Sequence, residues 1–274
     1  MKTNRFGVFA VVSFLAVFSA FAPGVRGDTI AYVSWIKNTS PFPSMVQQVD
    51  LDTGAITTIG TYSQEPMQIA FSPADHNLYA VVSGSAYGGT WEIDPTTGSI
   101  TSVWGPKNLP AIGFAPDGTL YAHGGAGQYL SKYDLADHTG GTFGNKLPLT
   151  FHGLLGGIAI DSSGDAFTAT QYQHLYSVNL TDGDLTDLGI PKGMPFGVRS
   201  MAYDSSDRLL ACFDTGIYSI DVGSMTTTKI MSLTAPTGFM GQSFAVASVP
   251  EPATATLLIT GLLAGSAMLR RRRK

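Results

Sequence analysis

The sequence predicts an all-β fold, a β-propeller of about five four-stranded blades, with six or seven irregular blades as the alternative. Three observations predict it. Two sequence markers recur with a shared period of about 43 residues, each period holds four strand-like runs of 4 to 7 residues, and residues 28–248 show no convincing 3.6-residue apolar spacing. Four strands in that length match one propeller blade rather than a helical repeat, so we expect residues 28–248 to form the propeller domain.

The first 27 residues have the three parts of a secretory signal peptide. Lys2 and Arg5 precede an apolar stretch over residues 6–22, and small residues lead to a predicted cleavage between Gly27 and Asp28. The stretch is near membrane-spanning length, so a permanent N-terminal anchor is the alternative. In either case the following domain is expected outside the cytoplasm.

The first repeated marker is a strand that ends in Asp or Asn and runs into a Gly- or Thr-bearing turn, as in QQVDLDTG and TWEIDPTTG. Its spacings are 44, 40, 45 and 42 residues, and its members are Asp50, Asp94, Asp134, Asn179 and Asp221. A side chain repeated five times in one phase indicates a structural task, and we expect these side chains to accept hydrogen bonds within Asx turns.

The second marker is a strand, a turn and another strand, as in IGFAPDGTLYAHG, and its spacings are 43, 46 and 43 residues. It occurs four times within the body, at Phe71, Phe114, Ile160 and Tyr203. The fifth copy lacks its second strand at the end of the body, and an equivalent strand begins at Ile30. We therefore predict that the N-terminal strand closes the ring by pairing into the last blade, which removes an exposed sheet edge.

This pattern of YxID, TTG and AFSPDGTLYA-type segments resembles that of extracytoplasmic β-propeller repeat proteins, over roughly residues 29–247. The resemblance implies the fold. It does not imply an activity, because propellers serve as hydrolases, lyases, binding modules and structural scaffolds.

The charge and cysteine content of the body limit its partners. Residues 28–248 hold eight Lys and Arg against nineteen Asp and Glu, a net charge of −11, which repels nucleic acid phosphates. We expect no nucleic acid partner. Cys212 is the single cysteine, so no intrachain disulfide can form, and its apolar surroundings in LLACF predict a small buried side chain.

Carboxylates outside the repeated pattern are the candidates for hydrolytic chemistry. A glycosidase needs two carboxylates facing each other across about 5 to 10 Å. The candidates are Asp28, Glu65, Glu92 and Asp214, and none has a sequence context that separates it from a surface acid. We therefore assign no catalytic residue.

The sequence does not predict a metal or cofactor site. The histidines have no spacing typical of a transition-metal site, and they are His76, His123, His138, His152 and His174. The segments 161–165 and 182–184 resemble fragments of calcium loops but lack the further ligands, so we interpret them as turns. No phosphate-binding or dinucleotide fingerprint occurs, and no cofactor is expected.

The C-terminal 26 residues divide into three pieces. Val249-Pro250-Glu251-Pro252 is an extended segment, because proline lacks the N–H that helices and sheets need. Residues 253–269 carry no charge and are expected to form a short transmembrane helix. Five cations follow, which the positive-inside rule places in the cytoplasm: Arg270, Arg271, Arg272, Arg273 and Lys274.

The order of Pro-Glu-Pro, apolar segment and Arg cluster resembles the PEP-CTERM sorting signal, over residues 249–274 alone. The resemblance implies processing near the PEP motif by a membrane enzyme of the exosortase type, transient residence in the inner membrane, and delivery to the cell surface or the extracellular space. It also implies an association with exopolysaccharide and biofilm. A plain tail-anchored protein is the alternative.

Two functions follow from the sequence. The favoured one is a non-enzymatic, exported surface or matrix protein whose propeller binds carbohydrate or another protein, or serves as a structural scaffold. The other is a secreted glycoside hydrolase or lyase that acts on extracellular polysaccharide. An axis lined by Gly, Ser and apolar side chains would favour the scaffold, and a cluster of Glu65, Glu92 and histidines at one mouth would favour the enzyme.

Overall fold

A computed structural model describes residues 29–37, 39, 43–63, 66–82, 89–105, 109, 111–123, 129–143 and 155–247. The predicted signal peptide with its cleavage site at Gly27 and Asp28 and the whole predicted sorting signal from Val249 to Lys274 lie outside these residues. Among the residues that are described, no helix is long and apolar enough to cross a membrane.

Twenty strands in the described residues form five antiparallel sheets of four strands each, which confirms the five-bladed prediction. From the axis outward, the first blade consists of β20 (Phe239–Ala247), β1 (Ile30–Lys37), β2 (Ser44–Asp50) and β3 (Ile56–Tyr62). The second consists of β4 (Pro66–Phe71), β5 (Leu78–Val82), β6 (Gly89–Ile93) and β7 (Ile100–Val103).

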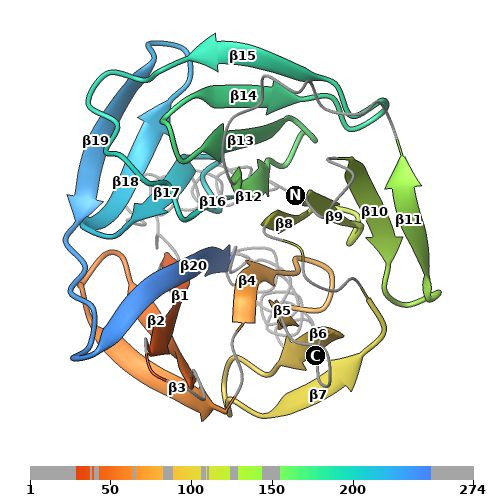
Figure 1. Cartoon of the computed structure of the whole chain (residues 1–274), viewed down its shortest axis with the longest axis vertical. Helices are drawn as coiled ribbons and strands as arrows, with labels where there is room; N and C mark the ends of the chain where they lie inside the picture. Colours follow the sequence, from red (N-terminus) through yellow and green to blue (C-terminus); the bar gives the residue numbers. More distant parts are fainter. Residues whose placement is uncertain are drawn as a thin grey trace, which may run out of the picture. The chain divides into compact units, whose positions relative to one another are not determined.

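The remaining blades repeat this order of strands. The third consists of β8 (Ala111–Phe114), β9 (Leu120–His123), β10 (Leu130–Asp134) and β11 (Thr139–Phe143). The fourth consists of β12 (Leu155–Ile160), β13 (Ala166–Thr170), β14 (Leu175–Val178) and β15 (Leu185–Gly189). The fifth consists of β16 (Ser200–Tyr203), β17 (Leu209–Phe213), β18 (Gly216–Asp221) and β19 (Thr226–Met231). Figure 1 shows the first strand of each blade near the axis and the fourth on the perimeter.

The second strand of each blade is largely buried on both faces because both faces are covered by neighbouring blades. In β5, Leu78, Ala80 and Val82 pack between the first and second blades, whereas Tyr79 and Val81 pack between the second and third. Five such clusters fill the interfaces between blades. Because side chains alternate along a strand, a continuous apolar run supplies two cores at once. Cys212 on β17 belongs to one of them, as predicted, and is 3% exposed.

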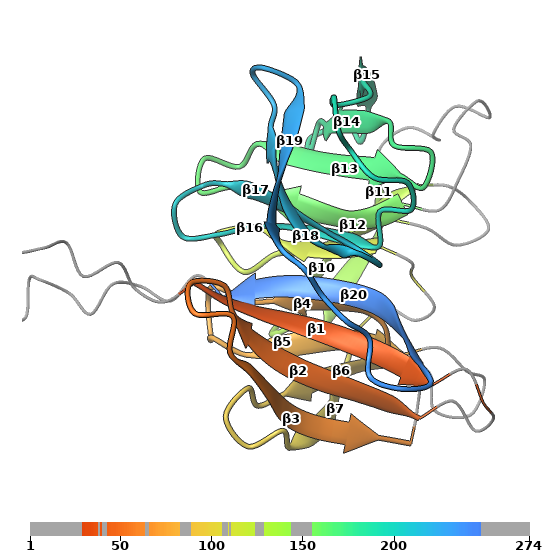
Figure 2. The same cartoon turned by 90° about the vertical axis from the view of Figure 1, so that its left-hand side faces the viewer.

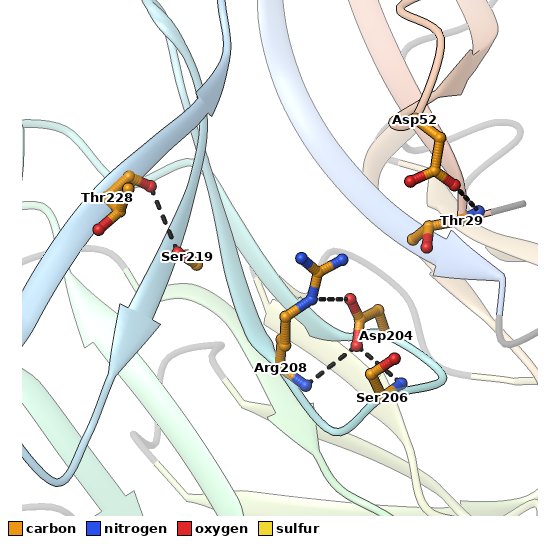
Figure 3. Close-up of polar contacts among 7 residues, drawn as sticks. All are labelled: Thr29, Asp52, Asp204, Ser206, Arg208, Ser219 and Thr228. Atoms are coloured by element: carbon orange, nitrogen blue, oxygen red, sulfur yellow. Dashed lines mark hydrogen bonds and ion pairs between the residues drawn. The ribbon is translucent and has the colours of Figure 1, made fainter. Parts of the chain in front are cut away.

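The ring closes between the two ends of the body, as the repeat predicted. The N-terminal strand β1 lies between β20 and β2, and Ile30 pairs with Ala247 while Val33 pairs with Phe244. Figure 2 shows β20 lying beside β1 along its length. The start of β1 is held by the turn that follows β2, because the Thr29 amide N–H donates to the Asp52 carboxylate at 3.0 Å (Figure 3).

Candidate functional site

The ring has two ends with different connections. At one end, which we call the crossover face, the second strand of each blade connects to the third strand, and the fourth strand connects to the next blade. The fully described connections at this face are residues 171–174, 190–199, 214–215 and 232–238. At the other end, the first strand turns into the second, as at 72–77 and 204–208, and we call it the turn face. Thr29 and Ala247 also lie at the turn face. In the first blade Ala247 ends the first strand and pairs with Ile30 at the start of the second, just as Phe71 pairs with Leu78 beside the turn of the next blade.

The repeated Asp and Asn side chains hold turns, as predicted. Asp50 Oδ1 accepts hydrogen bonds from the Asp52 and Thr53 amides, both at 2.9 Å. The other four members accept from the amides of residues two or three positions ahead: Asp94, Asp134, Asn179 and Asp221. These amide donors stabilise the ionised carboxylate and lower the pKa of Asp50, Asp94 and Asp221.

The two described off-pattern acids do not face each other. Glu92 lies on β6 beside the turn face, where its carboxylate accepts a hydrogen bond from the Asn77 side-chain amide at 2.5 Å. Asp214 lies in the connection between β17 and β18 at the crossover face, paired with Arg199. A glycosidase pair made of these two carboxylates is therefore ruled out by their places in the fold. Asp28 and Glu65 lie outside the described residues.

The described histidines are spread over the ring. His76 and His138 lie in exposed turns, His174 is hydrogen-bonded to Asp187 at 3.0 Å, and His123 is buried at the end of β9. His152 lies outside the described residues. Among the described His, Cys, Asp and Glu side chains, no group of three or more is placed to hold a metal ion.

The segments that resemble calcium-loop fragments are turns. Asp161 Oδ1 accepts from the amides of Ser163 and Asp165, at 2.9 and 2.8 Å. Asp182 Oδ1 accepts from the Asp184 amide at 3.0 Å. These hydrogen bonds confirm the interpretation of both segments as turns.

A small cavity lies between the third and fourth blades. Its walls include His123, Leu130, Ile158 and Thr168, and its volume of about 10 Å³ is the room of about one water molecule. Burial lowers the pKa of His123 to about 4, so this side chain is neutral at physiological pH. The cavity is partly open to solvent and is too small for an organic ligand.

The innermost strands of neighbouring blades pack closely through small and apolar residues. A Cβ on Gly113 would lie 1.9 Å from the Ile158 carbonyl oxygen, so β8 approaches β12 closely only because residue 113 is Gly. Ser243 Oγ donates to Gln68 Oε1 at 3.0 Å, and Ser200 Oγ donates to the Phe244 carbonyl oxygen at 2.9 Å. The described part of the axis therefore has the composition that favours a scaffold.

The crossover face presents an exposed aromatic pair. Tyr172, from the connection between β13 and β14, is 46% exposed, and Phe196, from the connection between β15 and β16, is 66% exposed. Their ring centroids lie 6.0 Å apart with the planes at 69°, an edge-to-face arrangement. The sequence analysis missed this pair. The available signal was a large aromatic side chain in each of two segments between predicted strands, Tyr172 in QYQH and Phe196 in MPFG.

Two pairs of polar or charged side chains lie on the same blades. Arg199, three residues after Phe196, donates from Nε and Nη2 to the two carboxylate oxygens of Asp214, both at 3.0 Å. These hydrogen bonds raise the pKa of Arg199. His174, two residues after Tyr172, contacts Asp187. The surroundings of the aromatic pair thus offer hydrogen-bonding groups in which each carboxylate already has a partner.

The protein is therefore a five-bladed β-propeller with an exposed aromatic pair on its crossover face. A solved structure with a similar fold is TolB from Acinetobacter baumannii, with a TM-score of 0.56 and 13% identity over 91% of this chain and 75% of that chain. Virginiamycin B lyase from Staphylococcus aureus is more distant, with a TM-score of 0.43 and 15% identity over 80% of this chain and 71% of that chain. The likeness to TolB, at this identity, shows the fold alone. Comparisons with protein-family models and with curated proteins find no match.

Proposed function

We propose that this protein is an exported binding scaffold: the signal peptide directs export, the propeller presents the aromatic pair to a ligand outside the cytoplasm, and the C-terminal segment sorts the chain. The observation that carries the binding role is the exposure of Tyr172 and Phe196 on connections that the fold holds in place. Neighbouring aromatic side chains that stay exposed in a folded domain are a feature of interaction surfaces.

The position of the chain ends supports the sorting role. Ile30 and Ala247 are paired neighbours at the turn face, which is the end of the ring opposite the aromatic pair. The chain therefore leaves the ring after Ala247 at the turn face and not at the crossover face. The cleavage site at Gly27 and Asp28 and the motif Val249–Pro252 fall within a few residues of this strand pair.

The partner proposed for the C-terminal segment is an exosortase-type membrane enzyme. Its recognition elements are the PEP motif, the apolar segment 253–269 and the cations Arg270 to Lys274, and they lead to transient residence in the inner membrane followed by transfer to the surface or the extracellular space. An association with exopolysaccharide or biofilm belongs to the same proposal.

Mass spectrometry of the exported protein tests the sorting role. The full-length chain is expressed in a bacterium that carries such an enzyme, and in a matched strain without it. We expect a mature N-terminus at Asp28 in both strains. Loss of residues 270–274 is expected only in the strain that carries the enzyme. An exported protein with an intact Arg cluster in both strains would show a plain tail-anchored protein instead.

Retention on cells tests the binding role. The exported protein is recovered from washed cell surface and matrix and compared with a Tyr172→Ala, Phe196→Ala double variant. We expect the variant to be exported and processed equally but to pass into the wash. Equal retention of both proteins would contradict the proposal that this face binds.

A further inference from the structure

We propose that Tyr172 and Phe196 form a stacking platform for a neutral polysaccharide chain. This inference rests on the proposed binding function and assigns it a site and a class of ligand. It follows from three properties of the crossover face: the exposure of the rings, the way that the backbone holds them, and the balance of charge around them.

The two rings are held in place before any ligand arrives. The Gln173 side-chain amide donates to the Met194 carbonyl oxygen, and the Gly197 amide N–H donates to the Gln171 carbonyl oxygen at 3.2 Å. These contacts tie the connection that carries Phe196 to the one that carries Tyr172. Gln173 adopts a φ of 75°, a conformation that non-glycine residues adopt rarely and that the surrounding contacts must maintain. A preorganised surface loses little conformational entropy on binding.

The rings suit a ligand with polarised C–H groups and hydroxyls. An aromatic face carries the negative part of the ring quadrupole, so it attracts the partly positive C–H groups on one side of a sugar ring. A few polar side chains beside an apolar surface then fix the orientation of a ligand through hydrogen bonds. The pairs His174–Asp187 and Arg199–Asp214 are half-exposed and supply such groups on the two blades that carry the rings.

The charges select a neutral ligand over an acidic one. The Arg199 guanidinium lies 3.0 Å from the Asp214 carboxylate, and the His174 ring lies 3.0 Å from the Asp187 carboxylate, so neither pair leaves a net positive charge. The domain as a whole carries a net charge of −11 over residues 28–248. Uronate-rich polysaccharides, nucleic acids and anionic lipid surfaces are repelled by such a domain, whereas an uncharged sugar chain is not.

Affinity electrophoresis tests the site with defined polymers. The full-length protein, purified in a polyoxyethylene detergent that carries no sugar headgroup, is run in native gels that contain hydroxyethylcellulose, laminarin, dextran or galactomannan, or else alginate or polygalacturonate. We expect retardation by at least one neutral polymer and by neither acidic one. The Tyr172→Ala and Phe196→Ala variants should each weaken the retardation roughly tenfold, the effect of losing one well-placed aromatic contact.

Two controls separate loss of the site from loss of the fold. Tyr172→Phe keeps the ring and should keep the retardation, and Ile56→Ala removes another exposed apolar side chain, on β3, and should also keep it. All variants are compared by melting temperature. No retardation by any neutral polymer, retardation by acidic polymers alone, or retardation that survives both alanine substitutions would overturn the inference. If the double variant is nevertheless lost from cells in the retention experiment, the binding function stands and only the class of ligand is wrong.

Discussion

Asp204 illustrates how one carboxylate stabilises a turn of this ring. Its side chain is fully buried and accepts hydrogen bonds from the Ser206 and Arg208 amides at 2.9 and 3.0 Å, and from Arg208 Nε at 2.6 Å (Figure 3). The Asp in the corresponding turn of the third blade, Asp117, is exposed and accepts from the Thr119 amide. An Asp in the corresponding turns of two blades is thus expected to contribute differently to the free energy of unfolding.

Substitution of these two residues measures that difference. Asp204→Ala removes a buried acceptor of three hydrogen bonds, whose donors belong to the exposed residues Ser206 and Arg208, and should lower the free energy of unfolding by about 1.5–3 kcal/mol. Asp117→Ala, at an exposed turn, should lower it by less than about 1 kcal/mol. Chemical denaturation of the two variants beside the wild-type protein checks this, and equal losses would contradict the role given to burial.

His123 should make the stability depend on pH. Burial lowers its pKa to about 4, whereas in the unfolded chain the value is about 6.5. Between these values the unfolded chain binds a proton that the folded ring does not, so the contribution of His123 is fully present above pH 6.5 and is lost as the pH falls toward 4. The loss amounts to about 3 kcal/mol at most.

A glutamine at this position removes the titration. His123→Gln should flatten the fall in stability between pH 6.5 and 4, measured as the free energy of unfolding across that range. His76→Asn is the matched control, because His76 is exposed and its positive φ of 62° is tolerated by Asn. The pKa values of Asp50, Asp94 and Asp221 are lowered, so the stability that these carboxylates contribute is lost mainly below about pH 4, outside the range in which His123 titrates. A wild-type slope in the His123 variant would show that other groups cause it.

At the scale of elements, β1 closes the ring. It pairs with β20 over Ile30–Lys37 and with β2 over Ile30–Ile36, and its Ala31, Val33 and Trp35 side chains belong to the core between the first and fifth blades. Without β1, both neighbouring strands would expose unpaired edges.

Deletion of residues 28–36 should therefore abolish the cooperative thermal transition, as followed by circular dichroism. A chain that begins at Asp28 keeps β1 and is the control, and it should melt as the mature protein does. An unchanged melting temperature after the deletion would show that the ring does not need this closure.

At the scale of the whole molecule, the propeller ends where its last inner strand ends. Phe244 and Val246 on β20 are 1% and 5% exposed and belong to the core, and Ala247 pairs with Ile30. The segment proposed to sort the chain begins two residues later in the sequence, at Val249.

Truncation on either side of this boundary locates it. A chain that ends after Ser248 should keep the melting temperature of the full-length protein, whereas a chain that ends at Ser243 loses the buried part of β20 and should not fold cooperatively. Differential scanning calorimetry distinguishes the two. A large drop in the longer of the two truncated chains would show that residues beyond Ser248 stabilise the propeller.

The blades could be predicted from the sequence because their signals are local. The apolar run LYAVV, the Asp or Asn at the end of each third strand and the period of about 43 residues are all local features of the repeat. Closure through Ile30 could also be predicted, because one strand was missing at the end of the repeat and one was left over at its beginning. The carboxylates Glu92 and Asp214 could not be placed relative to each other until the strand order assigned them to opposite ends of the ring.

The repeat in the sequence therefore determines the strands, the turns, the number of blades and the ends of the domain, since hydrogen bonds and side-chain alternation within about 43 residues specify them. The pairing of Tyr172 with Phe196, the burial of His123 and the full burial of Asp204 were decided by the tertiary structure. The physical reason is that these environments form where connections and blades meet. Those contacts depend on how five sheets pack around one axis, and a single copy of the repeat does not specify that packing.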